Sequence, residues 1–258
     1  MDVLKKLFSL KGKTVLIAGG ARGIGKEVAK HLAGAGANIV IFDLNKEQAE
    51  ETANEISEKY SCQAISFEVD VTQPTQITNA LDKADYEMGS INLLYNNAGT
   101  VLQKPVIDLT PDEWKKVVDV NLNGIFFVAQ TFGKYLIKKK QKGSIVNTGS
   151  MSAKIVNYPQ RQASYNTSKA GVVQLTKSLA VEWADYGIRV NSISPGYIFT
   201  ELTSFVREDW REFWKDLTPQ KRMGSPEEVA GGVIFLLSDS ASYTTGTDLI
   251  MDGGFTIV

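Results

Sequence analysis

The sequence predicts an α/β protein in which one doubly wound, parallel sheet of seven strands carries helices on both faces. Three observations lead to this fold class. Seven short apolar runs rich in β-branched residues recur along the chain, longer segments of helical period separate them, and a glycine-rich turn joins the first run to a helical segment. No linker rich in proline or glycine and no internal repeat divides the 258 residues, so we expect a single domain over residues 1–258.

The predicted strands follow one another along the whole chain. The runs are Thr14–Ala18 (TVLIA), Asn38–Asp43 (NIVIFD), Ala64–Asp70 (AISFEVD), Asn92–Gly99 (NLLYNNAG), Ser144–Ser150 (SIVNTGS), Arg189–Gly196 (RVNSISPG) and Asp248–Gly254 (DLIMDGG). In a sheet of this kind, ligands bind beyond the carboxyl ends of the strands, at the crevice where the strand order reverses. The residues that end each run are therefore the first candidates for a functional site.

Composition excludes several classes of function. The 28 basic and 29 acidic residues nearly cancel, which argues against a general affinity for nucleic acid or an anionic membrane. Because Cys62 and His31 are the only cysteine and histidine, neither an internal disulfide nor a Cys/His zinc site can form; we expect no bound metal and a structural role for His31.

No apolar run approaches the ~20 residues of a membrane span. The N-terminus lacks the features of a secretory signal, so we expect a cytoplasmic protein.

The turn after the first run has the features of a dinucleotide site. In GGARGIG, Gly19, Gly23 and Gly25 have no Cβ, so a pyrophosphate can approach the helix N-terminus, where free N–H groups favour anions. Arg22 and Ile24 lie in the same turn and belong to the predicted coenzyme site. The G-x-x-x-G-x-G spacing is a variant of the dinucleotide fingerprint, and taken alone it also fits plain strand-to-helix geometry.

Asp43 carries the prediction of which coenzyme binds. It ends the second run, 18 positions after Gly25, close to where an acidic residue takes the adenosine ribose hydroxyls. Because a carboxylate there repels a 2′-phosphate, we predict NAD rather than NADP. Arg22 opposes this preference, since its guanidinium could pair with such a phosphate. The alternative role of Asp43 is to cap the helix that follows, which would not exclude the ribose role.

Two further strand ends are candidates for the coenzyme site. Asp70 and Val71 end the third run and could border an adenine. The NNAG segment ends the fourth run, where side-chain amides can bond the backbone and a glycine lets a coenzyme approach closely. The predicted contacts in this segment are Asn97, Ala98 and Gly99. A simple turn is the alternative for NNAG.

Acid–base chemistry is expected from a tyrosine rather than from the single histidine. Tyr165 and Lys169 stand four residues apart in the helical segment SYNTSKAGVVQLTKSLAVEWA, so their Cβ atoms share one face at about 5–6 Å. An ammonium that close, together with an oxidised nicotinamide, should lower the pKa of the phenol; a shift of about 3 units needs roughly 4 kcal/mol. Tyr165 could then take a proton from an alcohol, or donate one to a carbonyl. A solvated pair on a helix surface is the alternative.

Two more polar residues complete the predicted reacting end. Ser150 ends the fifth run and is the candidate donor to a developing alkoxide. Asn121, in DVNLNGIFF, is a polar side chain amid apolar neighbours in the middle of a predicted helix, where it could hold a water or a backbone carbonyl linked to Lys169. Each residue alone has a plain structural alternative, and their joint placement after the expected strands favours catalysis.

Together these motifs resemble those of the short-chain dehydrogenase/reductase family, from about Leu10 to the C-terminus. The matching segments are GGARGIG, NNAG, the Asn121 helix, Ser150, YNTSK and SPGYIFT. The resemblance implies a Rossmann fold and places a nicotinamide ribose on Lys169. It also implies a catalytic tetrad of Asn121, Ser150, Tyr165 and Lys169. The segment implied to hold the nicotinamide and pyrophosphate supplies Pro195, Gly196, Ile198 and Thr200.

The chain departs from the family pattern at two places. Ala18 replaces the usual threonine before the first glycine, which removes a turn hydrogen bond but no catalytic group. The loop MSAKIVNYPQRQAS, between Ser150 and Tyr165, is two residues longer than the common spacing. In this it is similar to sugar-alcohol and ketose reductases, which share a SLAVEWA helix and a DGGFT-like ending. The resemblance therefore implies an NAD(P)-dependent oxidoreductase that interconverts a secondary alcohol and a ketone of a polyol, ketose or sugar acid.

Substrate contacts and a lid are expected around this loop. Residues 200–224 form the predicted lid, whose aromatic residues could close on a substrate or simply pack against the body of the protein. These aromatic residues are Phe205, Trp210, Phe213 and Trp214. The candidates for binding substrate hydroxyls are Ser152, Asn157, Gln162 and Tyr197. Arg161 could take a carboxylate or a phosphate.

The sequence also bears on assembly and leaves two other functions open. The last strand lies at a sheet edge, which invites pairing with another copy, and the resemblance implies a homotetramer. The same frame could reduce 3-oxoacyl thioesters of an acyl carrier protein, which would require a basic rim. A protein of another class would sense nucleotides without catalysis. Loss of Tyr165 or Lys169 would mark that case, and both are present.

Overall fold

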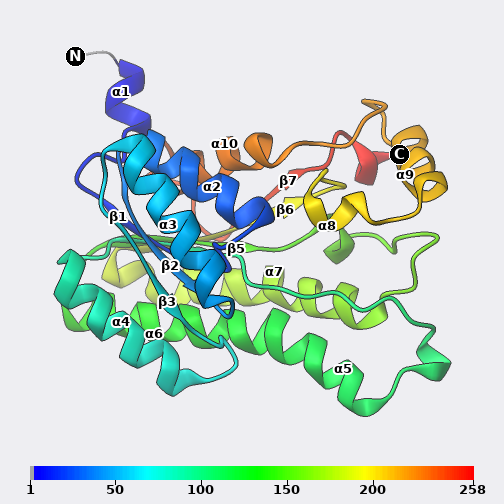
Figure 1. The fold of residues 1–258 in the computed structure, drawn as a ribbon, viewed down its shortest axis with the longest axis horizontal. Coiled ribbons are helices and arrows are strands. Elements are labelled where there is room, and N and C mark those ends of the chain that lie inside the picture. Colours follow the sequence, from blue (N-terminus) through cyan, green and yellow to red (C-terminus); the bar gives the residue numbers. More distant parts are fainter. Residues whose placement is uncertain (1–2) are drawn as a thin grey trace.

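The computed structural model describes residues 3–258, apart from the side chains of Lys5 and Leu202. Within this range seven parallel strands form one sheet in the order β3-β2-β1-β4-β5-β6-β7. The predicted single-domain, doubly wound α/β fold is confirmed (Figure 1). The strands are β1 Thr14–Ala18, β2 Asn38–Asp43, β3 Ala64–Glu68, β4 Leu93–Asn96, β5 Gly143–Thr148, β6 Ile188–Pro195 and β7 Asp248–Met251.

Helices cover both faces of the sheet, which explains why its strands are continuous apolar runs. On one face α2, α3 and α10 pack against the strands, and on the other α4, α6 and α7 do so (Figure 1). All five residues of β1 are buried between these two layers. The helices are α1 Val3–Phe8, α2 Gly23–Gly34, α3 Lys46–Tyr60, α4 Pro74–Met88, α5 Pro111–Val118, α6 Ile125–Lys138, α7 Ala163–Trp183, α8 Glu201–Ser204, α9 Glu208–Leu217 and α10 Pro226–Leu237.

The strand order reverses between β1 and β4, at the centre of the sheet. From β1 the chain winds outward through β2 and β3, and from β4 it winds outward through β5, β6 and β7. Ala18, the last residue of β1, pairs with Phe42 on one side and with Asn96 on the other. The segments that follow β1, β2 and β4 therefore leave the same edge side by side, where this fold class binds ligands.

Four strands, β3, β4, β5 and β7, are shorter than the runs that predicted them, because the last residues of those runs leave the sheet. β3 ends at Glu68, so Asp70 and Val71 lie in the turn beyond the strand rather than at its end. β7 ends at Met251 because Gly253 and Gly254 adopt φ values of +64° and +89°, which turn the chain out of the sheet.

The region around Asn121 also differs from the prediction of a regular helix. A π-helical stretch over Asp119–Gly124 joins α5 to α6. Gly124 lies against Val71, and a Cβ at Gly124 would stand 2.8 Å from Val71 Cγ2. The wide turn displaces the helical register locally, a feature that often marks functional sites.

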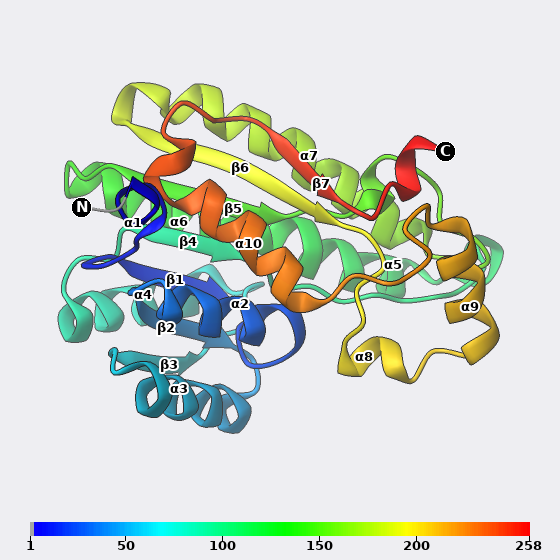
Figure 2. The same ribbon diagram turned by 90° about the horizontal axis from the view of Figure 1, so that it is seen from above.

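Residues 200–224 leave the sheet between β6 and α10 and include α8 and α9 (Figure 2). The predicted aromatic residues of this segment behave differently from one another. Trp214 is 3% exposed and packs against the body, whereas Phe205 is 83% exposed. Over residues 3–258, no helix is both long and apolar enough to cross a membrane.

Candidate active site

The glycine-rich turn after β1 packs directly against the NNAG segment after β4. Gly19 has φ of +78°, and a Cβ there would stand 2.7 Å from Ala98 Cα; a Cβ on Gly25 would stand 1.9 Å from the Gly19 carbonyl oxygen. Asn97 Nδ2 donates to that same carbonyl at 2.9 Å. Because neither glycine leaves room for a side chain, the two predicted coenzyme segments form one tight cradle.

The outer side of this cradle fits a pyrophosphate. Gly23 has φ of +54°, and no heavy atom lies within 4 Å of the position of a Cβ there. α2 begins at Gly23, and the side chain of Arg22, its N-cap residue, makes no capping hydrogen bond. Free N–H groups beside an open glycine suit an anion. Arg22 is exposed, and Ile24 packs against the core beneath the turn.

The carboxylate of Asp43 ties the end of β2 to the glycine-rich turn. Its Oδ2 accepts a hydrogen bond from Ala21 N at 3.0 Å, and its Oδ1 accepts one from Asn45 N at 3.1 Å. The helix cap that was the alternative role of Asp43 belongs instead to Asn45, whose Oδ1 accepts from Gln48 N at 3.0 Å. Asp43 therefore stands beside the cradle, at the edge where this fold class binds an adenosine ribose.

The two residues after β3 have local partners. Asp70 Oδ1 accepts hydrogen bonds from Thr72 N at 2.9 Å and from Thr72 Oγ1 at 2.8 Å. Val71 is 7% exposed and packs on the π-helical stretch. Their contact with an adenine stays a prediction.

Tyr165 and Lys169 lie on the first turns of α7 and face the strand ends. Lys169 Nζ lies 5.7 Å from the centroid of the Tyr165 ring. The same atom donates to the Thr148 carbonyl at 2.7 Å, at the end of β5, and lies 3.7 Å from the position of a Cβ on Gly99. The lysine is 3% exposed. The pair thus shares one face, as predicted, and lies between the ends of β4 and β5.

Burial shifts both of these groups away from their charged forms. It lowers the pKa of Lys169 to about 8. It raises the pKa of Tyr165 above its usual value, and a hydrogen bond with Ser150 opposes this rise. In the protein without its coenzyme, the pKa of Tyr165 is therefore raised, because desolvation of the phenolate outweighs the hydrogen bond with Ser150. The expected lowering by Lys169 together with an oxidised nicotinamide stays a prediction.

Ser150 lies beside Tyr165, in a segment with its own hydrogen bonds. Its hydroxyl donates to Ser152 Oγ at 3.0 Å and accepts from Ser152 N at 3.1 Å. The serine is 7% exposed, so it can reach a small ligand while remaining held by its neighbours.

Asn121 is fully buried and joins the loop after β4 to α7. Its Oδ1 accepts from Thr100 N at 2.7 Å, and its Nδ2 donates to Thr100 O at 2.8 Å and to Ser168 Oγ at 3.2 Å. Ser168 Oγ in turn donates to the Tyr165 carbonyl at 2.7 Å. The expected carbonyl partner of Asn121 is therefore that of Thr100, whereas Lys169 bonds Thr148.

The segment after β6 packs tightly against the C-terminal turn. A Cβ on Gly196 would stand 2.6 Å from Asp252 Cα, so only glycine fits there. Ile198 is 6% exposed and pairs with Gly224 in an isolated bridge. Thr200 caps α8 by accepting from Thr203 N at 3.3 Å. The predicted coenzyme residues of this segment are Pro195, Gly196, Ile198 and Thr200, and they form a continuous stretch from the end of β6.

The four predicted substrate residues come together in one hydrogen-bonded network. Gln162 Nε2 donates to Asn157 Oδ1 at 3.1 Å and to Ser152 Oγ at 3.5 Å. Asn157 Nδ2 donates to Tyr197 Oη at 3.3 Å. Through Ser152 the network reaches Ser150. We call this set the polar wall: Ser152, Asn157, Gln162 and Tyr197.

Sequence reasoning missed two residues that hold this arrangement, Thr148 and Gln160. Thr148 supplies the carbonyl for Lys169, and its position at the end of a predicted strand was the available signal. Gln160 is 5% exposed and bonds both Tyr197 and Trp214. In the sequence, the only indication of its role was its position in the long loop before Tyr165, between Asn157 and Gln162 of the polar wall.

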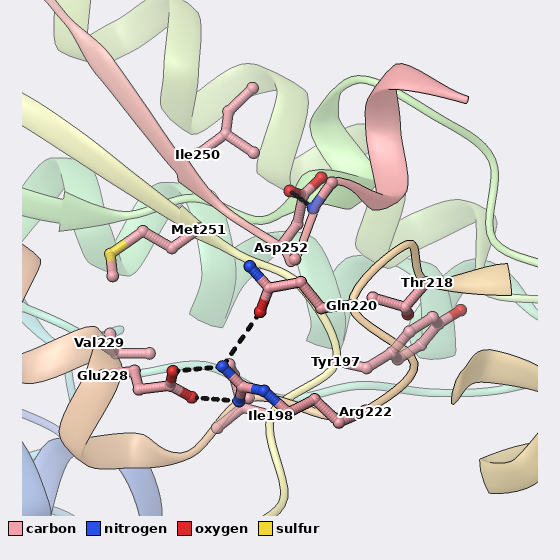
Figure 3. A pocket seen from close by; sticks show the side chains of 13 residues that line it. Tyr197, Ile198, Thr218, Gln220, Arg222, Glu228, Val229, Ile250, Met251 and Asp252 are labelled. Atoms are coloured by element: carbon pink, nitrogen blue, oxygen red, sulfur yellow. Dashed lines mark hydrogen bonds and ion pairs between the residues drawn. The ribbon is translucent and has the colours of Figure 1, made fainter. Parts of the chain in front are cut away.

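A cavity of about 310 Å³ lies next to the polar wall, on the side of β7 and α10. Figure 3 shows Tyr197 among the side chains that line it, together with an ion pair between Arg222 and Glu228 whose N and O atoms are 2.7 Å apart. Neither Tyr165 nor Lys169 lines this cavity. We therefore place the chemistry outside this cavity, where the cradle, the start of α7 and the polar wall meet at the strand ends.

Known proteins are similar to this chain in sequence and in fold over almost its whole length. Residues 19–256 match a family described as Enoyl-(Acyl carrier protein) reductase. The chain is 42% identical over 252 residues to the sorbose reductase of Candida albicans, covering 97% of this chain and 89% of that protein. It is 40% identical over 256 residues to the NADP-dependent mannitol dehydrogenase of Hypocrea jecorina, covering 98% and 96%. A short-chain type dehydrogenase/reductase from Mycobacterium marinum superposes with a TM-score of 0.95 at 41% identity, covering 98% of this chain and 99% of that one. With the strand order, the glycine cradle and the Tyr165–Lys169 pair, these matches show that this chain belongs to the short-chain dehydrogenase/reductase family of oxidoreductases.

Proposed function

We propose that this protein interconverts a polyol and the corresponding ketose with a nicotinamide dinucleotide, and that Tyr165 carries the proton. The observation that carries the proposal is the meeting of Tyr165, Lys169 and Ser150 beside the polar wall. The names of the sorbose reductase and the mannitol dehydrogenase support the substrate class. A wall of amides and hydroxyls suits a substrate with several hydroxyl groups.

Four residues of the chain would assist the reaction, each in a different role. When bound, the coenzyme supplies the hydride acceptor or donor and, oxidised, a positive charge. Ser150 donates to the oxygen of the reacting carbon, and Tyr165 takes the hydroxyl proton during oxidation or returns it during reduction. Lys169, held by the Thr148 carbonyl, keeps an ammonium near the phenol, and Asn121 positions the start of α7 through Ser168.

Turnover on a panel of substrates tests this function. Purified protein is assayed with sorbose and mannitol, and with a 3-oxoacyl thioester, using both coenzymes. We expect turnover of the sugar substrates, and we expect Tyr165→Phe to lower kcat by a factor of about 10² or more, because the proton carrier is lost. NADH fluorescence should show unchanged coenzyme binding. Tyr186→Phe, at a half-exposed tyrosine beyond the end of α7, is the matched control.

Three results would count against the proposal. Full turnover by Tyr165→Phe would remove the assigned proton carrier. Turnover of the thioester alone would identify an acyl reductase. Coenzyme binding without any turnover would identify a nucleotide sensor.

The residues and the relatives point to different coenzymes. A relative named as NADP-dependent favours NADP over the NAD that the sequence predicts. In this chain, however, the Asp43 carboxylate stands next to the cradle, tied to Ala21 N, and a negative charge there opposes a 2′-phosphate. We therefore propose NAD as the preferred coenzyme, with Arg22 as the residue through which NADP would bind.

Assembly and location remain proposals. β7 is an edge strand, and Ile250 on it is 37% exposed, which supports pairing of two copies and a homotetramer. Sedimentation of the purified protein measures this directly. The cytoplasmic location stays a prediction.

A further inference from the structure

Gln160 lies between the lid helix α9 and the polar wall. Its Oε1 accepts a hydrogen bond from Trp214 Nε1 at 3.2 Å, and its Nε2 donates to Tyr197 Oη at 2.9 Å. Both partners are held in place, because the rings of Tyr197 and Trp214 stack at 4.1 Å with planes 4° apart. Gln160 is 5% exposed and Trp214 is 3% exposed. One buried carboxamide thus connects the lid to the substrate side of the cleft.

The indole fixes which way this carboxamide points. An indole N–H can only donate, so the carbonyl oxygen of Gln160 has to face Trp214, and the amide nitrogen has to face Tyr197. The Tyr197 oxygen therefore accepts from Gln160, and its own proton is not used on that partner. The phenol is left with an O–H to donate elsewhere. The polar wall joins Tyr197 to Ser150 through Asn157, Gln162 and Ser152.

We propose that Gln160 is a positioning residue that keeps the Tyr197 hydroxyl a donor toward a substrate oxygen away from the reacting carbon, and that Trp214 of the lid sets its orientation. This inference rests on the proposed polyol/ketose activity and adds to it a determinant of substrate choice. It explains why a buried glutamine, an indole and a phenol meet where the lid touches the body.

Gln160→Glu tests this with little change of shape. One carboxylate oxygen still accepts from the indole, but the other now accepts the Tyr197 proton, so the phenol no longer donates to the substrate. We expect KM for sorbose to rise about tenfold, the loss of one hydrogen bond, with kcat within about threefold. Because the new carboxylate is buried, the unfolding midpoint should fall, so the readouts are kcat and NADH binding, which should stay close to those of the wild type. A purely structural role would lower stability and kcat together.

A double-mutant cycle with Tyr197→Phe makes the test specific. If Gln160 acts through the Tyr197 hydroxyl, Gln160→Glu should add little to the effect of Tyr197→Phe, so the two changes should be strongly non-additive. Gln141→Glu is the matched control, because Gln141 also bridges two partners, Ser90 Oγ at 2.6 Å and Ile91 O at 3.0 Å, beyond the end of α6. Its kinetic constants should match those of the wild type.

The outcomes separate this inference from the proposed function. If the wild type turns over neither sorbose nor mannitol, the proposed function is wrong. If the wild type reduces sorbose and Gln160→Glu keeps the same KM, or if its effect adds fully to that of Tyr197→Phe, the function stands and the role of Gln160 is wrong.

Discussion

At the scale of single residues, the charge on Asp43 is the determinant of coenzyme choice that is simplest to change. Asp43→Asn keeps the shape of the side chain and an oxygen that can accept from Ala21 N, but removes the negative charge. We expect kcat/KM with NADP to rise at least about tenfold, because repulsion of the 2′-phosphate is relieved. kcat/KM with NAD should fall, because a charged acceptor for the ribose hydroxyls is lost.

The measurement is kcat/KM with both coenzymes on one sugar substrate. In the double variant Asp43→Asn/Arg22→Ala, most of the gain in kcat/KM with NADP should be lost, because Arg22 is exposed at the turn and available to a phosphate. The kcat/KM with NAD should stay almost the same as in Asp43→Asn. A wild-type protein that already prefers NADP would show that Asp43 does not set the choice.

The reacting residues could be predicted from the sequence because each follows a recognisable strand or shares a helix face. Ser150 comes two residues after the end of β5, and Tyr165 and Lys169 are four apart on α7. Gln160 could not be predicted, since its role depends on Trp214, more than fifty residues away, meeting it across the cleft. The pKa of Tyr165 was also beyond a sequence argument, because it depends on how far the phenol is buried.

At the scale of elements, the junction of β1 and α2 should tolerate no side chain. In Gly25→Ala the new Cβ would stand 1.9 Å from the Gly19 carbonyl oxygen, so the turn has to open. We expect NADH binding to be lost and the free energy of unfolding to fall by about 1–3 kcal/mol, the usual cost of overpacking. Urea unfolding and NADH fluorescence measure the two effects.

Gly231→Ala is the matched control for this change. Gly231 lies inside α10, and no heavy atom lies within 4 Å of a Cβ there. Alanine in the middle of a helix should raise stability by about 0.5–1 kcal/mol and leave NADH binding intact. Equal effects of the two substitutions would mean that the cradle is not specially constrained.

Most elements could be predicted from the hydrophobic pattern, but the π-helical stretch between α5 and α6 could not. β1 and β2 begin and end where their apolar runs do, because both faces of each strand are buried. The π-helical stretch at Asp119–Gly124 leaves the hydrophobic pattern unchanged and moves only the hydrogen-bond register, so periodicity does not reveal it. Asn121 was found by its buried polarity, whereas its partner Thr100 was not.

At the scale of the whole molecule, the doubly wound order explains why distant segments build one site. Parallel strands need crossover connections, and reversing direction once, between β1 and β4, brings the residues after both strands to one crevice. The alternation of strands and helices in the sequence predicts a doubly wound parallel sheet, but not the order of its strands. It does not predict how residues 200–224 lie, because α8 and α9 contribute no strand to the sheet.

The stability of the whole protein should depend on pH through Lys169. Burial lowers the pKa of this lysine from 10.5 to about 8, so above pH 8 the folded protein has released a proton that the unfolded chain still binds. Stability then rises with pH wherever the unfolded state binds more protons. The wild type should therefore gain about 2 kcal/mol relative to Lys169→Met between pH 7 and pH 9.5.

Urea unfolding of the two proteins at a series of pH values and one protein concentration checks this. Lys169→Met also leaves the Thr148 carbonyl without its donor, but that loss is a constant offset and does not change the slope with pH. Lys177→Met, at an exposed position of the same helix, is the control and should run parallel to the wild type. A difference between wild type and Lys169→Met that stays flat from pH 7 to 9.5 would mean that the lysine is charged and solvated in the folded protein. In that case the ammonium would persist over this pH range, but water around it would weaken its attraction for a Tyr165 phenolate.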